Sequence, residues 1–305
     1  MRKLQVTVAV VALCALALIA NAFWVDARTR DAAPRDGGRI IDTQVVPANV
    51  RVEGAGPAIV LIHGFGAAID WWDQVAPALA SNYRVIRIDL IGHGGTAAPR
   101  SGYSIERQAR LVSAILDQLG VDRFTVIGHS MGGEVATALA AMNPQRVDHM
   151  ILIDSPATSA KGNFSVMTDA YFEPPLGELL AHFESDKAIR RGLAQGFAPG
   201  FPVPDSFVAD IRQLTYTAFR HAHEESIAYR SAKPPYERIA ALQPLPPLLV
   251  IFGTRDAIVP PEEAKFFQRV PGAKVSMIEG AGHSPMVESP EKVLDLIQSF
   301  LRPAP

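Results

Sequence analysis

The sequence predicts an α/β fold in which helices flank a mainly parallel β-sheet. Two observations predict it. Short apolar runs have the length and residue types of strands buried on both faces, and helix-length segments separate most of these runs. The runs are Ala58–Ile62, Arg84–Asp89, Phe124–Ile127, Met150–Asp154, Leu248–Phe252 and Lys274–Ile278. Strands that alternate with helices form parallel sheets through right-handed crossovers. Residues 39–53 are expected to add a leading antiparallel hairpin.

Helix signals lie where this alternation requires them. Ser104 is placed to cap a helix that runs to Leu119, and Gly120 is placed to end it. Met131–Met142 is expected to form a second helix. The pair Ser289-Pro290 predicts the start of the last one, with a capping residue followed by proline at the first helical position.

The alternation fails between residues 156 and 247. This stretch of 92 residues holds 11 of the 24 prolines and no convincing strand. Dense prolines favour short helices, expected around Gly177–Phe183 and Phe207–Phe219. Because the segment is too long for a loop, we interpret 156–247 as a helical cap inserted into a core made of 39–155 and 248–302.

Residues 1–25 at the start of the chain are largely apolar, and two interpretations of this segment are possible. Its length is close to the ~20 residues that span a bilayer, which predicts a retained anchor with Phe23 and Trp24 at the interface. The triplet Ala20–Ala22 matches a cleavage site, which predicts a secretory signal peptide instead. Both readings export the folded domain, either membrane-anchored or secreted or periplasmic. Residues 26–38 are polar, contain glycine and proline, and are expected to be a linker.

Charge and cysteine content exclude several classes of function. There are 29 basic and 31 acidic residues, a net charge of −2, so a nucleic-acid partner has no electrostatic support. Cys14 is the single cysteine and lies in the apolar segment. The remainder of the chain therefore has no disulfide, thiolate nucleophile or cysteine-ligated zinc site.

The motif Gly128-His129-Ser130-Met131-Gly132 follows a predicted strand and opens a predicted helix. G-x-S-x-G in that setting is a nucleophile elbow, a tight turn that exposes the serine at the carboxyl end of the sheet. The glycines are needed because the turn leaves no room for larger side chains. We therefore expect Ser130 to be the nucleophile.

A serine hydroxyl needs a base, and the base needs an acid to orient it. His283 follows the last predicted strand in a glycine-rich loop and is the expected base. Asp256 follows the preceding strand and is the expected acid. Asp154, at the end of an earlier strand, remains an alternative acid. The order Ser130, Asp256, His283 is the one expected for this strand–turn–helix elbow.

Two further groups complete the predicted site. The backbone N–H groups of Phe65 and Met131 are expected to stabilise an oxyanion, because the glycines beside Phe65 let its loop turn towards the elbow. His63 is expected to brace that loop by hydrogen bonding. Trp71 and Trp72 are candidates for the substrate pocket, with core packing as the alternative.

With these motifs, and with Asp89–Gly94 and Trp71-Trp72, the chain resembles cap-bearing α/β-hydrolases from about residue 40 to 302. The resemblance implies an eight-stranded sheet, the roles just assigned and no metal or organic cofactor. Related epoxide hydrolases and haloalkane dehalogenases have aspartate at the nucleophile position. Ser130 argues against both of those chemistries.

The resulting hypothesis is a serine hydrolase that cleaves a carboxylic ester of small or medium apolar acyl size. The main alternative is a carbon–carbon bond hydrolase of dienoic diketo acids, in which cap arginines such as Arg190 or Arg191 would bind a carboxylate. Lactonase, peptidase, acyltransferase and cofactor-free peroxidase activities are also found on this fold. A non-catalytic scaffold is the alternative from another class. The expected partner is a small acyl substrate, while the cap sequence leaves its identity open.

Overall fold

The computed structural model describes residues 2–160 and 171–302 of the chain and contains one eight-stranded sheet. The strand order is β1-β2-β4-β3-β5-β6-β7-β8. The strands are β1 Arg39–Ile41, β2 Ala48–Glu53, β3 Ala58–Ile62, β4 Arg84–Ile88, β5 Phe124–His129, β6 Val147–Ile153, β7 Leu248–Gly253 and β8 Lys274–Ile278. β1, β2 and β4 pair antiparallel, and all other pairs are parallel. The predicted leading hairpin and mainly parallel sheet are confirmed.

The central strands are buried on both faces, as their continuous apolar runs predict. The side chains of β3 from Ile59 to Ile62 are fully buried, and Ile62 pairs with Ile88 of β4 and Gly128 of β5. The carboxyl ends of β3, β4 and β5 therefore lie at the same edge. Loops that leave this edge carry the chemistry of parallel α/β sheets.

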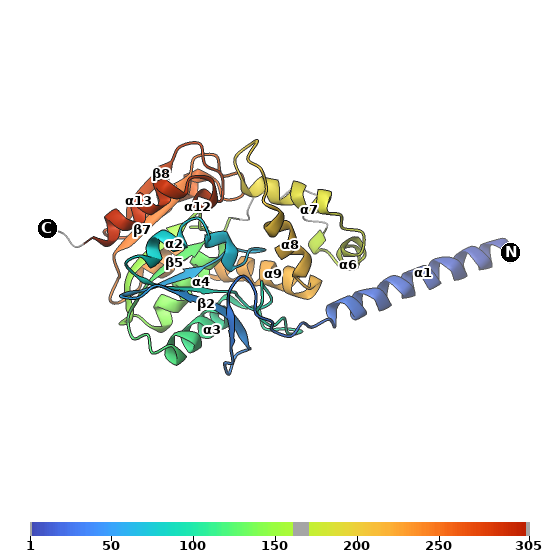
Figure 1. Ribbon diagram of the computed structural model, residues 1–305. Coiled ribbons are helices and arrows are strands. Elements are labelled where there is room, and N and C mark those ends of the chain that lie inside the picture. Colours follow the sequence, from blue (N-terminus) through green and yellow to red (C-terminus); the bar gives the residue numbers. More distant parts are fainter. Residues whose placement is uncertain (1, 161–170, 303–305) are drawn as a thin grey trace.

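Helices cover both faces of the sheet (Figure 1). One face is packed by α3 (Ile105–Gln118) and α4 (Met131–Met142), and the other by α2 (Ala76–Ala80) and α13 (Pro290–Leu301). The remaining core elements are η1 Ile69–Trp72, η3 Pro261–Glu263, α11 Ala264–Phe267 and α12 Pro285–Glu288.

The predicted helix signals act as expected. Ser104 Oγ accepts the Arg107 N–H at 3.3 Å, and Gly120 ends α3 with φ +64°. Ser289 is the N-cap residue of α13 and Pro290 its first residue, although the Ser289 side chain makes no capping hydrogen bond. The boundaries at Ser104 and Gly120 are therefore set by the residue types that predicted them, whereas Ser289 lies at the predicted position without acting as a side-chain cap.

The insertion between β6 and β7 is helical in its described part, with no strand there. It contains α6 Leu176–Ala181, α7 Asp186–Leu193, η2 Ala194–Gly196, α8 Asp205–Gln213, α9 Tyr216–Ala232 and α10 Pro235–Ala240. The expectation of short helices only is wrong for α9, which has 17 residues because no proline lies between Pro204 and Pro234. The single helix expected at 207–219 is two helices. Leu214 is extended, and Thr215 Oγ1 accepts the Ala218 N–H and starts α9.

The apolar N-terminal segment forms a single helix, α1 (Arg2–Asp26), which projects away from the remainder of the molecule (Figure 1). The segment after it is not a free tether. Arg30 pairs with Ala98 and donates a side-chain hydrogen bond to the Thr96 carbonyl, and Ala33 donates to the Gly95 carbonyl. The expected linker thus lies along the core, because its arginine and backbone groups find partners there.

Candidate active site

Ser130 occupies the sharp turn between β5 and α4. Its φ of +52° and ψ of −122° are unfavourable for a residue with a side chain, and a non-glycine residue is held there only by surrounding structure. A Cβ on Gly128 would collide with the Gly132 carbonyl, and one on Gly132 would collide with the Ile62 carbonyl. The two glycines of the motif are therefore required by close backbone contacts.

His283 lies between Ser130 and Asp256. Its Nε2 is 2.9 Å from Ser130 Oγ, and its Nδ1 is 2.7 Å from Asp256 Oδ2. Asp256 accepts the Nδ1 proton as a carboxylate, which leaves Nε2 unprotonated and able to accept the serine proton. The structure thus brings the three predicted residues together from three loops. This chain of hydrogen bonds can increase the nucleophilicity of a serine oxygen.

Asp256 is held in its charged form inside the protein. Burial raises its pKa, but the charge and hydrogen bond of His283 counteract this, and the net pKa lies below the ordinary value. The other carboxylate oxygen accepts the N–H groups of Ile258 and Val259 at 2.8 and 2.9 Å. These bonds fix the orientation of the carboxylate towards the imidazole.

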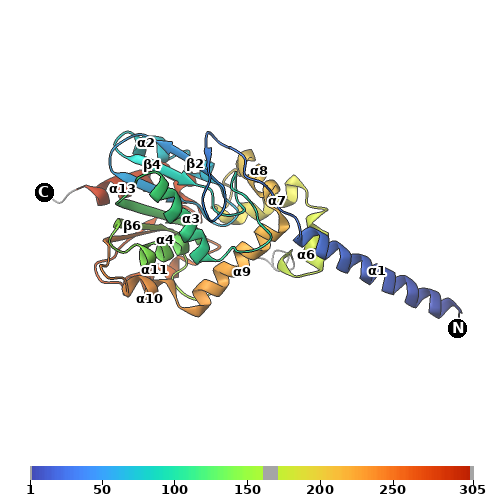
Figure 2. The same cartoon turned by 90° about the horizontal axis from the view of Figure 1, so that it is seen from below.

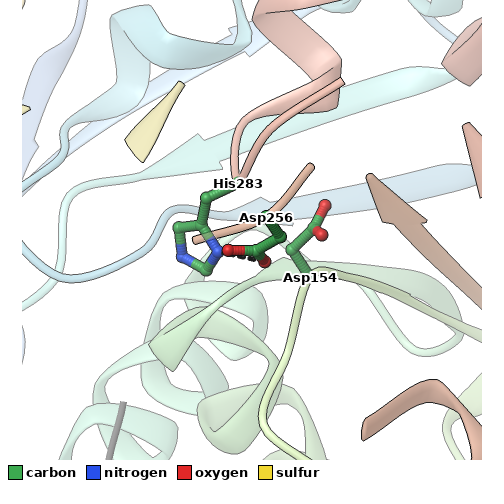
Figure 3. Close-up of side chains that lie close together, drawn as sticks. All are labelled: Asp154, Asp256 and His283. Atoms are coloured by element: carbon green, nitrogen blue, oxygen red, sulfur yellow. Dashed lines mark hydrogen bonds and ion pairs between the residues drawn. The ribbon is translucent and has the colours of Figure 1, made fainter. Parts of the chain in front are cut away.

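The alternative acid, Asp154, lies behind Asp256 and not beside the imidazole (Figure 3). It is fully buried at the end of β6 with φ +45°, and its Oδ1 accepts the Gly253 N–H at 2.9 Å. Burial, and next the charge of Asp256, raise its pKa well above the ordinary value. The buried surroundings of Asp154 therefore favour its protonated form.

Asp154, Asp256 and His283 are residue types that bind metals, and their ligand atoms lie within 4.8 Å of one another. The cluster has a simpler physical account. Two buried carboxyl groups close together share a proton, because both cannot be ionised there at once. The single imidazole donor that faces them is already engaged by Asp256.

The two expected oxyanion donors lie beside Ser130. Phe65 and Met131 line the same cavity as Ser130. In the described part of the chain, the Phe65 N–H has no hydrogen-bond partner, and Met131 is the first residue of α4, whose N–H points out of the helix. The expectation for His63 is confirmed: it is fully buried, and its ring nitrogens contact the Gly64 carbonyl and the Leu90 N–H.

A cavity opens at Ser130 between the core and the cap. Its lining is apolar on one side and polar towards α9. The lining residues are Phe65, Ser130, Met131, Pro156, Ala160, His223, Ser226, Arg230, Ile258, Val259, Pro260 and Glu263.

The pocket role expected for Trp71 and Trp72 is wrong for this cavity, because neither side chain lines it. Trp72 is completely buried in the core. Trp71 stacks on Phe207 with ring centroids 4.0 Å apart and donates Nε1–H to Asp210 at 3.2 Å. Both rings lie on η1, in the core on the sheet face that α2 and α13 cover, and Trp71 also contacts α8 of the cap. Core packing, the alternative, accounts for them.

The cap arginines expected at the cavity are also placed elsewhere. Arg190 donates to the Val203 carbonyl and pairs with Asp205, and neither it nor Arg191 lines the cavity. Arg230 lines it instead. Its Nη1 lies 3.2 Å from Glu134 on α4 and 2.7 Å from Ser226.

Two residues that support His283 were missed by sequence reasoning. Glu288 accepts the N–H groups of Gly282 and Ser284, which lie on both sides of His283. His129 Nε2 lies 2.7 Å from the His283 carbonyl. No motif marks Glu288. His129, in contrast, stands in the elbow motif itself, directly before the nucleophile.

Comparisons with known proteins agree with this geometry. Residues 57–290 match the family described as alpha/beta hydrolase fold. The chain is 29% identical over 257 residues to a pimeloyl-[acyl-carrier protein] methyl ester esterase of Aeromonas hydrophila, covering 81% of this chain and 96% of that one. It is 27% identical over 288 residues to a 2-hydroxymuconate semialdehyde hydrolase of Pseudomonas putida, covering 88% and 95%.

A solved structure of an N-acyl homoserine lactonase has the same fold, with a TM-score of 0.72 and 21% identity, and the match covers 87% of this chain and 96% of that one. The family match spans most of the core described above, including the loops of Ser130, Asp256 and His283. The protein belongs to the α/β-hydrolase fold family.

Proposed function

We propose that the protein is a serine hydrolase that cleaves carboxylic esters through an acyl-enzyme. The observation that carries the proposal is the hydrogen-bonded series Ser130–His283–Asp256, with distances of 2.9 and 2.7 Å. The methyl ester esterase among the relatives supports an ester substrate. The apolar side of the cavity supports an apolar acyl group.

The reaction proceeds by nucleophilic attack of Ser130 Oγ on the ester carbonyl carbon, while His283 Nε2 takes the hydroxyl proton. The N–H groups of Phe65 and Met131 stabilise the negative oxygen of the tetrahedral intermediate. When the bond to the leaving alkoxide breaks, His283 returns the proton and an alcohol departs. Water then attacks the acyl-enzyme by the same route, and the carboxylic acid is released.

A fluorophosphonate probe tests the serine chemistry directly. We expect it to label the folded protein at Ser130 and to leave Ser130→Ala unlabelled. If folded wild type is not labelled, the non-catalytic alternative gains support and the hydrolase proposal fails. An ester series of increasing acyl length then defines the substrate class.

One second candidate has its own support. The relative named 2-hydroxymuconate semialdehyde hydrolase is similar over 88% of this chain, and Arg230 offers a guanidinium at the cavity wall. These observations favour carbon–carbon bond hydrolysis of a dienoic diketo acid as the alternative. Turnover of such a compound, measured beside the ester series, decides between the two.

We also propose that α1 is a retained anchor and that the catalytic domain is exported. In the part of the chain that the structure describes, α1 is the one helix long and apolar enough to span a membrane, and a signal sequence would have the same character. Mass spectrometry of the mature chain distinguishes the two, because cleavage after Ala22 would give a chain that starts at Phe23.

A further inference from the structure

The apolar part of α1 is about as long as the hydrocarbon core of a bilayer is thick. It runs from Lys3 to Val25, 23 residues with a mean hydropathy of 2.5, and most of its side chains are exposed, whereas Val25 at its end is buried. At 1.5 Å per residue it is about 34 Å long, close to the ~30 Å hydrocarbon core of a bilayer. If the helix spans a bilayer, the bilayer surface therefore lies near Val25.

The cap contacts α1 within the last turn of this span. Val25 is only 3% exposed, and its carbonyl accepts a hydrogen bond from Thr217 of α9. One turn earlier, Asn21 Oδ1 lies 2.8 Å from Nε2 of His182, which also stacks on Trp24. Because no spacer separates the span from the cap, a bilayer that holds α1 must meet the cap surface.

The cap surface beside α1 carries two large exposed apolar side chains. In Figures 1 and 2, α6 lies at the end of the domain from which α1 departs. Leu176 at the start of α6 and Phe183 just after its end are 48% and 77% exposed. Arg28 lies over the ring of Trp24, a cation and an interfacial aromatic as found at membrane surfaces. We call Leu176, Phe183 and Trp24 the α6 face.

A second cavity lies between the end of α1 and the cap. Val25 and Arg28 line it on the α1 side, and Phe219 lines it on the cap side. The ring of Phe219 contacts that of Phe65, with centroids 4.8 Å apart. Phe65 in turn lines the cavity at Ser130. The contact between these two rings therefore joins the lining of this cavity, which we call the membrane-side cavity, to the lining of the candidate active site.

We propose that the α6 face rests on the bilayer and that long-chain acyl esters reach Ser130 from the lipid through the membrane-side cavity. The proposal rests on the hydrolase function and on the retention of α1. Its physical basis is the cost of exposing an acyl chain to water, which increases with each methylene. A chain that passes from lipid directly into a cavity between α1 and the cap avoids that exposure.

The position of the cap is tested with nitroxide labels on the full-length protein in vesicles of phosphatidylcholine and phosphatidylglycerol. Cys14→Ala removes the single native cysteine, and Leu176→Cys and Phe183→Cys each provide one labelling site. Met277→Cys on β8 is the control, because Met277 is also apolar and 44% exposed. The measurement compares the collision rate of each label with oxygen, which dissolves in the bilayer, and with a nickel complex, which stays in water. We expect oxygen to dominate for the labels at 176 and 183 and the nickel complex to dominate for the label at 277. Equal exposure of all three to water would overturn the proposal, as would cleavage of α1.

The route of the substrate is tested with the double variant Leu176→Glu/Phe183→Glu. We expect its turnover of a long-chain ester dissolved in vesicles to fall at least tenfold, whereas turnover of a water-soluble acetate ester stays within twofold. Met277→Glu is the matched control and should lower neither activity. Unchanged turnover of the vesicle ester by the double variant would overturn the route.

The proposal of a hydrolase function can be disproved independently of the position of the α6 face. If wild type hydrolyses neither ester and resists the fluorophosphonate, the hydrolase proposal is wrong and the substrate route falls with it. The nitroxide measurement then still decides whether the α6 face rests on the bilayer.

Discussion

His129 holds the backbone of His283: its Nε2 lies 2.7 Å from the His283 carbonyl oxygen, and the two rings are 5.0 Å apart. Burial, and next the charge of His283, lower the pKa of His129 to about 3. His129 is therefore neutral throughout the ordinary pH range. The neutral ring of His129 donates a hydrogen bond to the carbonyl without repelling the imidazolium that His283 forms during turnover.

We predict that His129→Ala lowers kcat about tenfold and changes KM less than twofold. A tenfold change corresponds to about 1.4 kcal/mol, the size of one ordinary hydrogen bond that holds a reacting group in position. His129→Gln retains an N–H donor and should recover part of the rate. Steady-state kinetics of both variants provide the measurement, and an increase in KM with unchanged kcat would show that His129 contacts substrate instead.

Asp256→Asn is expected to leave the fold intact and to lower kcat by about 10²–10⁴. The asparagine amide favours the wrong imidazole tautomer and cannot stabilise the imidazolium, and the corresponding change in a serine protease costs about 10⁴. Asp154→Asn should reduce kcat less than threefold, because Asp154 does not contact the imidazole and its surroundings favour the protonated form, which an amide resembles.

Measuring kcat/KM for these two variants, with circular dichroism to confirm folding, separates the two acids. Loss of activity in Asp154→Asn alone would make Asp154 the acid. The elbow at Ser130 would be unaffected by that result.

Ser130→Ala should lower kcat at least as much as Asp256→Asn. Adding His283→Ala to it should lower kcat less than about threefold further, because the members of such a unit act together and their effects are not additive. The rates are compared by single-turnover kinetics on one activated ester. Multiplicative losses in the double variant would mean that the two side chains act independently.

The three proposed catalytic residues could be predicted because their signals are local. Ser130 and Asp256 each follow a buried strand, His283 follows the edge strand β8, and glycines lie beside two of the three residues. The carboxyl ends of parallel strands lie at one edge, so chain position alone indicates that they can meet. The sheet was predictable for the same reason, since burial on both faces leaves continuous apolar runs.

The cap was less predictable because its residues take their roles from distant partners. Arg230 is held at the cavity by a hydrogen bond to Glu134, which lies 96 positions earlier in the chain. Trp71 stacks on Phe207 of α8 and so belongs to the cap–core contact, which no spacing near residue 71 reveals. Likewise, Arg30 is fixed by carbonyls near residue 96, although composition alone indicates a linker.

Asp210 on α8 gives the cap–core contact a dependence on pH. Burial, and next the charge of Asp70 on η1, raise its pKa to about 9, while Trp71 donates a hydrogen bond to it. A carboxyl whose pKa is higher in the folded than in the unfolded protein stabilises the fold below the unfolded pKa of about 4. That stabilisation is lost progressively as the pH rises to about 9, because the unfolded chain ionises while the folded chain keeps the proton.

We therefore predict that Asp210→Asn is more stable than wild type at pH 8, by about 2 °C or more in Tm, and equal to it near pH 4. Asparagine replaces a protonated carboxyl without a change of shape and cannot ionise, so at least about 1 kcal/mol of pH-dependent loss disappears. Asp205→Asn on the same helix is the control, because the Asp205 side chain is 95% exposed and should give the pH profile of wild type. Thermal unfolding of the three proteins from pH 4 to 9 provides the measurement. The contradicting outcome is a Tm difference between Asp210→Asn and wild type that does not change with pH. It would mean that the pKa of Asp210 is not raised in the folded protein, and therefore that Asp210 lies apart from Asp70.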